Sequence, residues 1–278
     1  MTETRTTPPP LRKGGGAVST AATGSSVAEN SFSVLSGRKT GAQRIVLYGP
    51  GGVGKSTLAA LAPEPVFLDI EGGTRELDVP RVEGIESFAD LRAALQSGTL
   101  EGYKTVVLDS ATRAEEWSIA HTVKTVPHEK GHSVTSLEGY GFGRGLQHNY
   151  DTFLRLLQDL DGQVRRGRNV ILICHDCTAD VPNPVGDDYI RFEPHLQAPK
   201  SGKASIRNRV VQWADHVLFI GYDIIGKEGK GRGTGTRTIW TFELPDHIAK
   251  SRMLREALPF QSIDDSTIWK LIFEGGVR

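Results

Sequence analysis

The sequence predicts an α/β protein whose mostly parallel central sheet is flanked by helices. Short apolar runs alternate with amphipathic segments of helix length from Arg44 onward, which is typical of a parallel sheet covered on both faces. A glycine-rich loop also separates the first strand from the first helix, and two later apolar runs end in acidic residues. We therefore expect the ligand site to lie at the carboxyl edge of the sheet, beside the glycine-rich loop.

The elements follow in chain order. The strands are expected where apolar residues run for four to six positions, namely at 44–48, 65–70, 105–108, 169–174, 216–220 and 238–243, with a last strand near 269–273. The helices are expected where apolar residues recur at helical spacing, namely at 55–61, 87–96, 113–123, 150–164 and, shorter, at 206–213. Two stretches, 127–145 and 177–204, have little periodicity and follow the ends of these elements.

Composition excludes several classes of protein. No apolar run approaches the roughly 20 residues that span a bilayer, and no apolar segment follows the polar, basic amino terminus, so we expect neither a membrane span nor a secretory signal. Two cysteines argue against a disulfide framework and favour a cytoplasmic location. The 33 basic and 33 acidic residues balance, which argues against a nonspecific polycation.

Residues 1–43 predict a disordered arm, because they are rich in Thr, Pro, Gly, Ser and Ala and contain few large apolar side chains. The arm has five basic and two acidic residues, hence a net charge of +3. Residues 44–278 then form the single folded domain.

The strongest signal is a phosphate-binding motif of the form GxxxxGK[ST] between the first strand and the first helix. It comprises Gly49, Pro50, Gly51, Gly52, Val53, Gly54, Lys55, Ser56 and Thr57. Small residues allow backbone N–H groups to surround the β-phosphate of ATP, Lys55 reaches the β- and γ-phosphate oxygens, and Ser56 binds Mg²⁺. The alternative is a glycine-rich turn without a ligand.

Two other strand ends supply carboxylates. Asp109 ends the run Thr105-Val-Val-Leu and predicts the acid that holds Mg²⁺ through its water shell; alternatively, it caps the following helix. Ser110 follows where many ATPases have a catalytic glutamate. We therefore assign the catalytic base to Glu71, after Val66-Phe-Leu-Asp69-Ile, with Asp69 second. Alternatively, these two acids cap a glycine turn and take no part in chemistry.

These motifs, together with Val170-Ile-Leu-Ile-Cys-His175, resemble the ATPase core of RecA-type recombinases. The likeness spans about residues 43–276 and is greatest to the minimal phage-encoded ATPases associated with single-strand annealing. The resemblance implies that Glu71 is the catalytic base and that His175 occupies the position of the γ-phosphate sensor, where the family usually has an amide. Histidine can also donate a hydrogen bond to phosphate.

The run Cys174-His175-Asp176-Cys177 also invites a zinc or redox interpretation. A tetrahedral zinc site needs more ligands, no second CxxC motif is present, and the nearby His121, His128 and His132 are scattered. We expect Cys174 to be buried in its strand.

The segment from Leu244 to Arg252 resembles the family's lysine-containing segment that reaches the nucleotide of the adjacent protomer. Lys250 and Arg252 are accordingly candidate cations supplied in trans, which stabilise charge on the transferring phosphate. The alternative is a solvated basic turn.

Two segments are candidates for single-stranded DNA. The window from Lys200 to Arg237 has eight basic and three acidic residues, a net charge of +5. The resemblance places the principal DNA loop at its start, and basic side chains there favour phosphate binding: Lys200, Lys203, Arg207 and Arg209. The other candidate residues are Tyr140, Phe142 and Arg144; the aromatic rings alternatively pack onto the next helix.

The leading functional hypothesis is a DNA-dependent ATPase that uses ATP and Mg²⁺, binds single-stranded DNA and promotes annealing or strand exchange in phage recombination. It would act in the host cytoplasm as a ring or filament with nucleotide between protomers, and a single-strand-binding protein is a candidate partner. The alternatives are a helicase loader or replication accessory on the same core, and a small-molecule P-loop kinase.

Overall fold

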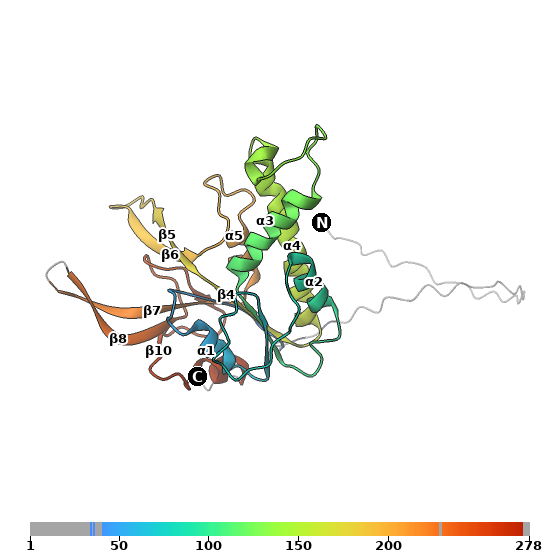
Figure 1. Cartoon of the computed structure of the whole chain (residues 1–278). Helices are drawn as coiled ribbons and strands as arrows, with labels where there is room; N and C mark the ends of the chain where they lie inside the picture. The colour runs from blue at the N-terminus through green and yellow to red at the C-terminus, as the bar shows by residue number, and fades with distance from the viewer. Residues whose placement is uncertain (1–33, 35, 37–40, 228–229, 275–278) are drawn as a thin grey trace, which may run out of the picture. The chain divides into compact units, whose positions relative to one another are not determined.

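The computed structural model describes residues 34, 36, 41–227 and 230–274 (Figure 1). Most of the arm expected at residues 1–43 lies outside the described residues, so that expectation stays a prediction. The side chains of 225–227 and 230–232 are also outside the description. No helix in the part of the chain that the structure describes is long and apolar enough to cross a membrane.

The folded unit contains parallel and antiparallel strands and six α-helices among its described residues. The strands are β1 (Arg44–Tyr48), β2 (Pro65–Asp69), β3 (Thr105–Asp109), β4 (Asn169–Cys174), β5 (Asp176–Val181), β6 (Tyr189–Pro194), β7 (His216–Lys227), β8 (Lys230–Trp240), β9 (Lys250–Ser251) and β10 (Leu258–Pro259). The helices are α1 (Lys55–Ala60), α2 (Phe88–Gln96), α3 (Ala111–Thr125), the 3-10 helix η1 (Leu137–Tyr140), α4 (Arg144–Arg165), α5 (Ile206–Trp213) and α6 (Thr267–Phe273).

The main sheet has the order β10-β8-β7-β1-β4-β3-β2, with β9 paired to β7. Its five strands from β7 to β2 are parallel, and β8, β9 and β10 are antiparallel additions. The predicted fold class is therefore confirmed. Because β4 lies between β1 and β3, the ends of these three strands meet at one edge, and Asp69 of β2 is in register with Asp109 of β3.

Helices cover both faces of the sheet. One face packs against α2, α3, α4 and α5 through residues such as Leu91, Leu156 and Val210. The opposite face packs against α1 and α6, where Leu58 and Trp269 are buried. Strand side chains alternate between these two layers, as the period of two requires. The core is thus built on the sheet and leaves its carboxyl edge to the loops.

Residues 269–273 were expected to form a strand, and this prediction is wrong. They belong to helix α6, whose Ile268, Trp269 and Ile272 are buried at helical spacing. The indole of Trp269 donates a hydrogen bond of 2.7 Å to the Leu58 carbonyl of α1. A short apolar run fits either element by composition, and here its spacing decides the outcome.

The stretch 177–204 was expected to be irregular, but it contains the antiparallel hairpin β5–β6, which forms a separate two-stranded sheet. Several other elements are longer than expected, among them α3, which was expected at 113–123. The helix expected at 150–164 begins already at Arg144, and β7 and β8 extend beyond the core as a long hairpin (Figure 1).

Candidate phosphate and magnesium site

The glycine-rich loop joins β1 to α1 and has little room for side chains. A Cβ atom at Gly49 would lie 2.1 Å from the Ile220 carbonyl oxygen of β7, so only glycine fits there. The ammonium of Lys55 donates to the carbonyl oxygens of Gly49 and Pro50, at 2.7 and 2.9 Å. Burial lowers the pKa of Lys55, while Asp176 and Asp109 oppose this effect. The cation is therefore held within the loop, where the motif requires it for phosphate.

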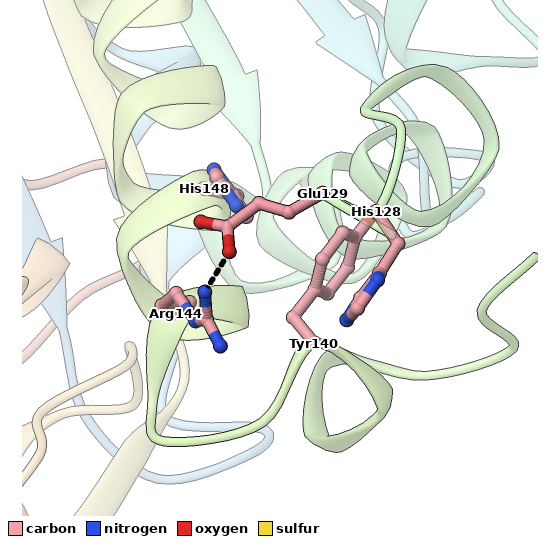
Figure 2. Close-up of a pocket in the computed structure, with 5 residues that line it drawn as sticks. All are labelled: His128, Glu129, Tyr140, Arg144 and His148. Carbon is pink, nitrogen blue, oxygen red and sulfur yellow. Dashed lines mark hydrogen bonds and ion pairs between the residues drawn. The ribbon is translucent and has the colours of Figure 1, made fainter. Parts of the chain in front are cut away.

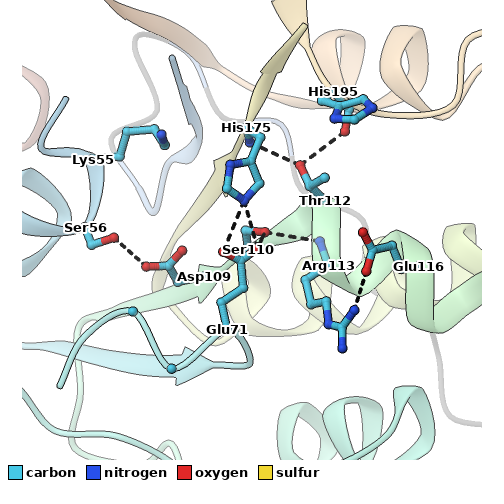
Figure 3. Close-up of polar contacts among 12 residues, drawn as sticks. Lys55, Ser56, Glu71, Asp109, Ser110, Thr112, Arg113, Glu116, His175 and His195 are labelled. Carbon is cyan, nitrogen blue, oxygen red and sulfur yellow. Dashed lines mark hydrogen bonds and ion pairs between the residues drawn. The ribbon is translucent and has the colours of Figure 1, made fainter. Parts of the chain in front are cut away.

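Ser56 and Asp109 meet at the end of β3. The Ser56 hydroxyl donates a 2.6 Å hydrogen bond to Oδ2 of Asp109 (Figure 3). Burial raises the pKa of Asp109 to about 6, opposed by the Ser56 hydrogen bond and helped by Glu71 and Asp69. A hydroxyl and a carboxylate are hard oxygen donors, and Mg²⁺ is commonly held by one or two carboxylates plus substrate phosphates. The residues present therefore fit a Mg²⁺ site that the nucleotide completes.

Helix α3, which follows β3, is capped by Ser110. Ser110 accepts a hydrogen bond of 3.1 Å from the Arg113 amide at the start of α3, so the cap of α3 is Ser110 and not Asp109. The alternative interpretation, in which Asp109 caps this helix, is therefore wrong. Its carboxylate is left for Ser56 and a cation.

Asp69 shapes the turn after β2. Its carboxylate accepts hydrogen bonds from the amides of Glu71, Gly72, Gly73 and Thr74 and from the Thr74 hydroxyl. Burial raises its pKa, but the hydrogen bonds from Thr74, Gly72 and Gly73 outweigh burial and hold the pKa below its ordinary value. Asp69 thus caps the glycine turn, as the alternative interpretation expected for both acids.

The Glu71 side chain takes no part in that turn and faces His175. The Nε2 atom of His175 lies 3.0 and 3.1 Å from the two carboxylate oxygens of Glu71 (Figure 3). The Ser110 hydroxyl donates to the same carboxylate, and the His175 amide donates to the Thr112 hydroxyl at 3.1 Å. Glu71 therefore lies at the end of β4, beside the Asp109–Ser110 segment.

One polar residue at the loop was not singled out from the sequence. Nη1 of Arg237, from β8, donates a 2.9 Å hydrogen bond to the Val53 carbonyl, and its guanidinium lies 4.4 Å from the centre of the Phe260 ring. Val53 and Arg237 are 184 positions apart. The only sequence signal for Arg237 was its place as the last of the eight basic residues counted between Lys200 and Arg237.

Lys250 and Arg252 do not reach this site within their own chain. The two residues lie beside the first residues of β7, where β9 pairs with His216 and Val217, whereas the loop approaches Ile220 further along β7. Arg252 forms a 2.9 Å ion pair with Asp215, and Lys250 donates to the Gln212 carbonyl at 3.5 Å. Any contact with nucleotide would have to be made with a neighbouring protomer.

The aromatic candidates for DNA differ in exposure. Tyr140 is 2% exposed, and its hydroxyl donates to the Thr122 and Val126 carbonyls at 3.2 and 2.7 Å, which favours the packing interpretation. Phe142 is 99% exposed, with the Arg144 guanidinium 5.7 Å from its ring centre. Arg144 also pairs with Glu129 (Figure 2).

The basic loop candidates also separate into two groups. Lys200, Lys203 and Arg209 are exposed. Arg207 is half-buried and forms an ion pair with Glu193, which is itself buried. Arg207 is therefore already neutralised within the fold, and the other three cations remain accessible to a ligand.

The cysteines form no disulfide. Cys174 is buried in β4 as expected, and Cys177 is half-buried. The described residues contain no group of three or more His, Cys, Asp or Glu side chains that could hold a metal ion.

Comparison with known proteins identifies a family that matches most of the chain. A family described as "AAA domain" matches residues 41–253, more than half of the chain. Among solved structures, the chain is similar to a KaiC-like protein from the hyperthermophilic archaeon Pyrococcus horikoshii. That match has 15% sequence identity and a TM-score of 0.40, and covers 81% of this chain and 88% of that one. No curated protein matches the chain significantly.

Proposed function

The chain belongs to the AAA-domain family, and from this premise we propose that it is a DNA-dependent ATPase that promotes annealing or strand exchange of single-stranded DNA in phage recombination. One observation carries the ATPase part of the proposal: five polar side chains from four segments of the chain, the start of α1 and the ends of β2, β3 and β4, converge at the carboxyl edge of the sheet. They are Lys55, Ser56, Glu71, Asp109 and His175.

Each of these side chains has a role that its surroundings favour. Lys55 binds the β- and γ-phosphate oxygens after leaving the Gly49 and Pro50 carbonyls. Ser56 and Asp109 would hold Mg²⁺, Asp109 through the water shell of the ion, and the ion would neutralise charge on the phosphates. Because Asp109 is buried, its carboxylate is poorly solvated without a cation.

Glu71 orients the attacking water and accepts its proton. A carboxylate has about four lone-pair sites, so Glu71 can accept from water while the Ser110 hydroxyl occupies one of them. His175 is hydrogen-bonded to Glu71. Glu71 would then be the base, and the neighbouring His175 ring, if it turned toward the γ-phosphate, would donate a hydrogen bond to it.

The DNA part of the proposal is supported by charge and exposure. Lys200, Lys203 and Arg209 are exposed on the segment after β6, and the His195 amide at its start donates to the His175 carbonyl at 2.9 Å. The start of the segment therefore lies beside His175, near the proposed phosphate site. Lysine and arginine near this edge would supply salt-dependent binding to the DNA backbone.

Assembly completes the proposed function. Lys250 and Arg252 lie beside the first residues of β7, away from the chain's own phosphate-binding loop, which suits a contribution to a neighbouring nucleotide in a ring or filament. Hydrolysis would then depend on assembly, because part of the charge stabilisation is supplied in trans. A single-strand-binding protein would be a partner that delivers the DNA.

The test is ATP hydrolysis with and without single-stranded DNA across a series of salt concentrations, with Lys55→Ala as the control. We expect DNA to stimulate hydrolysis, salt to weaken the stimulation and the control to be inactive. Hydrolysis without any DNA stimulation or DNA binding would refute the recombination role. Stimulation by a helicase would indicate a loader, and phosphorylation of a nucleoside would indicate a kinase.

A further inference from the structure

We propose that Arg237 is a positioning residue for nucleotide binding: it holds the Val53–Gly54 peptide so that the Gly54 amide faces the phosphates. This inference rests on the proposed ATPase function. Arg237 lies on β8, outside the phosphate-binding motif, and reaches the loop from the side opposite to Asp109, because β7 and β8 lie on the other side of β1 from β4 and β3.

Arg237 is fixed from both its backbone and its side chain. Its carbonyl accepts a 2.7 Å hydrogen bond from the Phe260 amide, and its guanidinium stacks over the ring of Phe260, 4.4 Å from the centre. Phe260 is fully buried. A guanidinium held over a buried ring loses little further freedom when it donates a hydrogen bond.

The hydrogen bond to Val53 sets the direction of the next amide. In a trans peptide the C=O and the N–H point in opposite directions. Since the Val53 carbonyl is bound to Arg237 at 2.9 Å, the Gly54 N–H must point away from Arg237, toward the interior of the loop. Backbone N–H groups in this loop are the groups that bind phosphate.

The same contact leaves little room at position 54. A Cβ atom at Gly54 would lie 2.9 Å from Nη1 of Arg237 and 3.0 Å from Cε1 of Phe260. The backbone there has φ of 101°, which favours glycine independently. Arg237 and Phe260 therefore pack directly against the loop backbone.

Arg237 also faces the loop without a neutralising partner. The flanking Thr236 and Thr238 donate to the Asp223 carboxylate at 2.6 and 2.7 Å, and alternation places their side chains on the other face of β8. Among the described residues, no carboxylate forms an ion pair with Arg237. Its positive charge therefore adds to that of Lys55 at the site of the polyphosphate.

The experiment compares Arg237→Ala and Arg237→Lys with Thr236→Ala, a matched change on the same strand that does not touch the loop. The readouts are the dissociation constant of ADP carrying a fluorescent ribose label, the midpoint of thermal unfolding without nucleotide, and the KM and kcat for ATP. We expect Arg237→Ala to weaken ADP binding about tenfold, as for loss of a charged hydrogen bond. KM should rise about equally and kcat should stay within about twofold, because the phosphate contact is made in both ground and transition states.

Arg237→Lys retains charge without the planar donor fork and is expected to weaken ADP binding about threefold or more; it also serves if Arg237→Ala does not fold. Either folded variant binding ADP within about twofold of the wild type would overturn the inference. So would a loss of ADP affinity that Thr236→Ala reproduces. If the wild type itself binds no ADP, the proposed function fails. If the wild type binds ADP and Lys55→Ala does not, the phosphate site is functional. In that case, ADP binding by Arg237→Ala at the wild-type affinity refutes the positioning role of Arg237 alone.

Discussion

Replacing Asp109 by asparagine should stabilise the nucleotide-free protein while abolishing hydrolysis. Asp109 is 5% exposed, and burial raises its pKa from 3.8 to about 6. Each unit of pKa corresponds to about 1.4 kcal/mol, so the ionised carboxylate costs the folded state about 3 kcal/mol. Asparagine has nearly the same shape, and its carbonyl oxygen can still accept the Ser56 hydrogen bond.

The effect depends on pH in a defined direction. Between pH 3.8 and about 6 the folded protein retains a proton on Asp109 that the unfolded chain has released. Ionisation therefore destabilises the folded state progressively as the pH rises through this window. The free energy of unfolding of Asp109→Asn should exceed that of the wild type by about 3 kcal/mol at pH 8, and the difference should vanish below pH 3.8.

The assay is urea unfolding at pH 8 and pH 5 in EDTA, with Asp151→Asn as a control for an exposed acid. The control should change the free energy of unfolding by less than about 0.5 kcal/mol. Adding Mg²⁺ and nucleotide should stabilise the wild type more than Asp109→Asn. An asparagine variant that is less stable than the wild type at pH 8, or a difference that does not change with pH, would refute the reasoning.

The remaining predictions concern the catalytic base, the turn, a buried histidine and the proposed trans cation. Glu71→Gln should retain ATP binding and lower kcat by about 10²- to 10⁴-fold; single-turnover hydrolysis at the wild-type rate would remove the assignment. Asp69→Ala removes the acceptor of five hydrogen bonds and should lower the free energy of unfolding by about 2–4 kcal/mol, measured in urea; an unchanged midpoint would contradict its role in the turn. Burial lowers the pKa of His216 from 6.5 to about 4, so the unfolded chain takes up the proton first as the pH falls and the wild type should lose about 3 kcal/mol between pH 6.5 and 4. His216→Asn should show a flatter acid profile, and an identical slope would argue against burial as the cause. Arg252→Ala should leave ATP affinity unchanged and lower kcat at least about tenfold in the assembled state; full activity of the assembled variant would exclude a trans role.

The groups at the sheet edge could be predicted because each stands at the end of a contiguous signal. The motif from Gly49 to Thr57 predicts the phosphate-binding loop by itself, and Asp109 and His175 each stand at the end of an apolar strand. Parallel strands bring their carboxyl ends to one edge, so the meeting of these residues follows once the strands are recognised. The sequence already ranked Glu71 before Asp69 as the catalytic base, and the observed hydrogen bonds add that the glycine turn uses the Asp69 carboxylate.

The hairpin β5–β6 and helix α6 were missed for opposite reasons. Residues 176–181 carry charged and small side chains, half-buried or exposed, so they lack the apolar run by which a strand is recognised. The strand forms because its backbone groups pair with β6. The run from Ile268 to Phe273, by contrast, is apolar enough for a strand, but its buried positions and the indole hydrogen bond to α1 require a helix.

The contact between Arg237 and Val53 could not be predicted from the phosphate-binding motif or from the periodicity of apolar residues. Periodicity reports on one element at a time, and this contact depends on the position of β8 two strands away from β1 in the sheet. The motif determines which groups can touch phosphate, whereas the surrounding sheet determines how the loop backbone is held. Nucleotide affinity should therefore respond to substitutions far from the motif in sequence, and β8, which contacts the loop directly, is the first place to look for them.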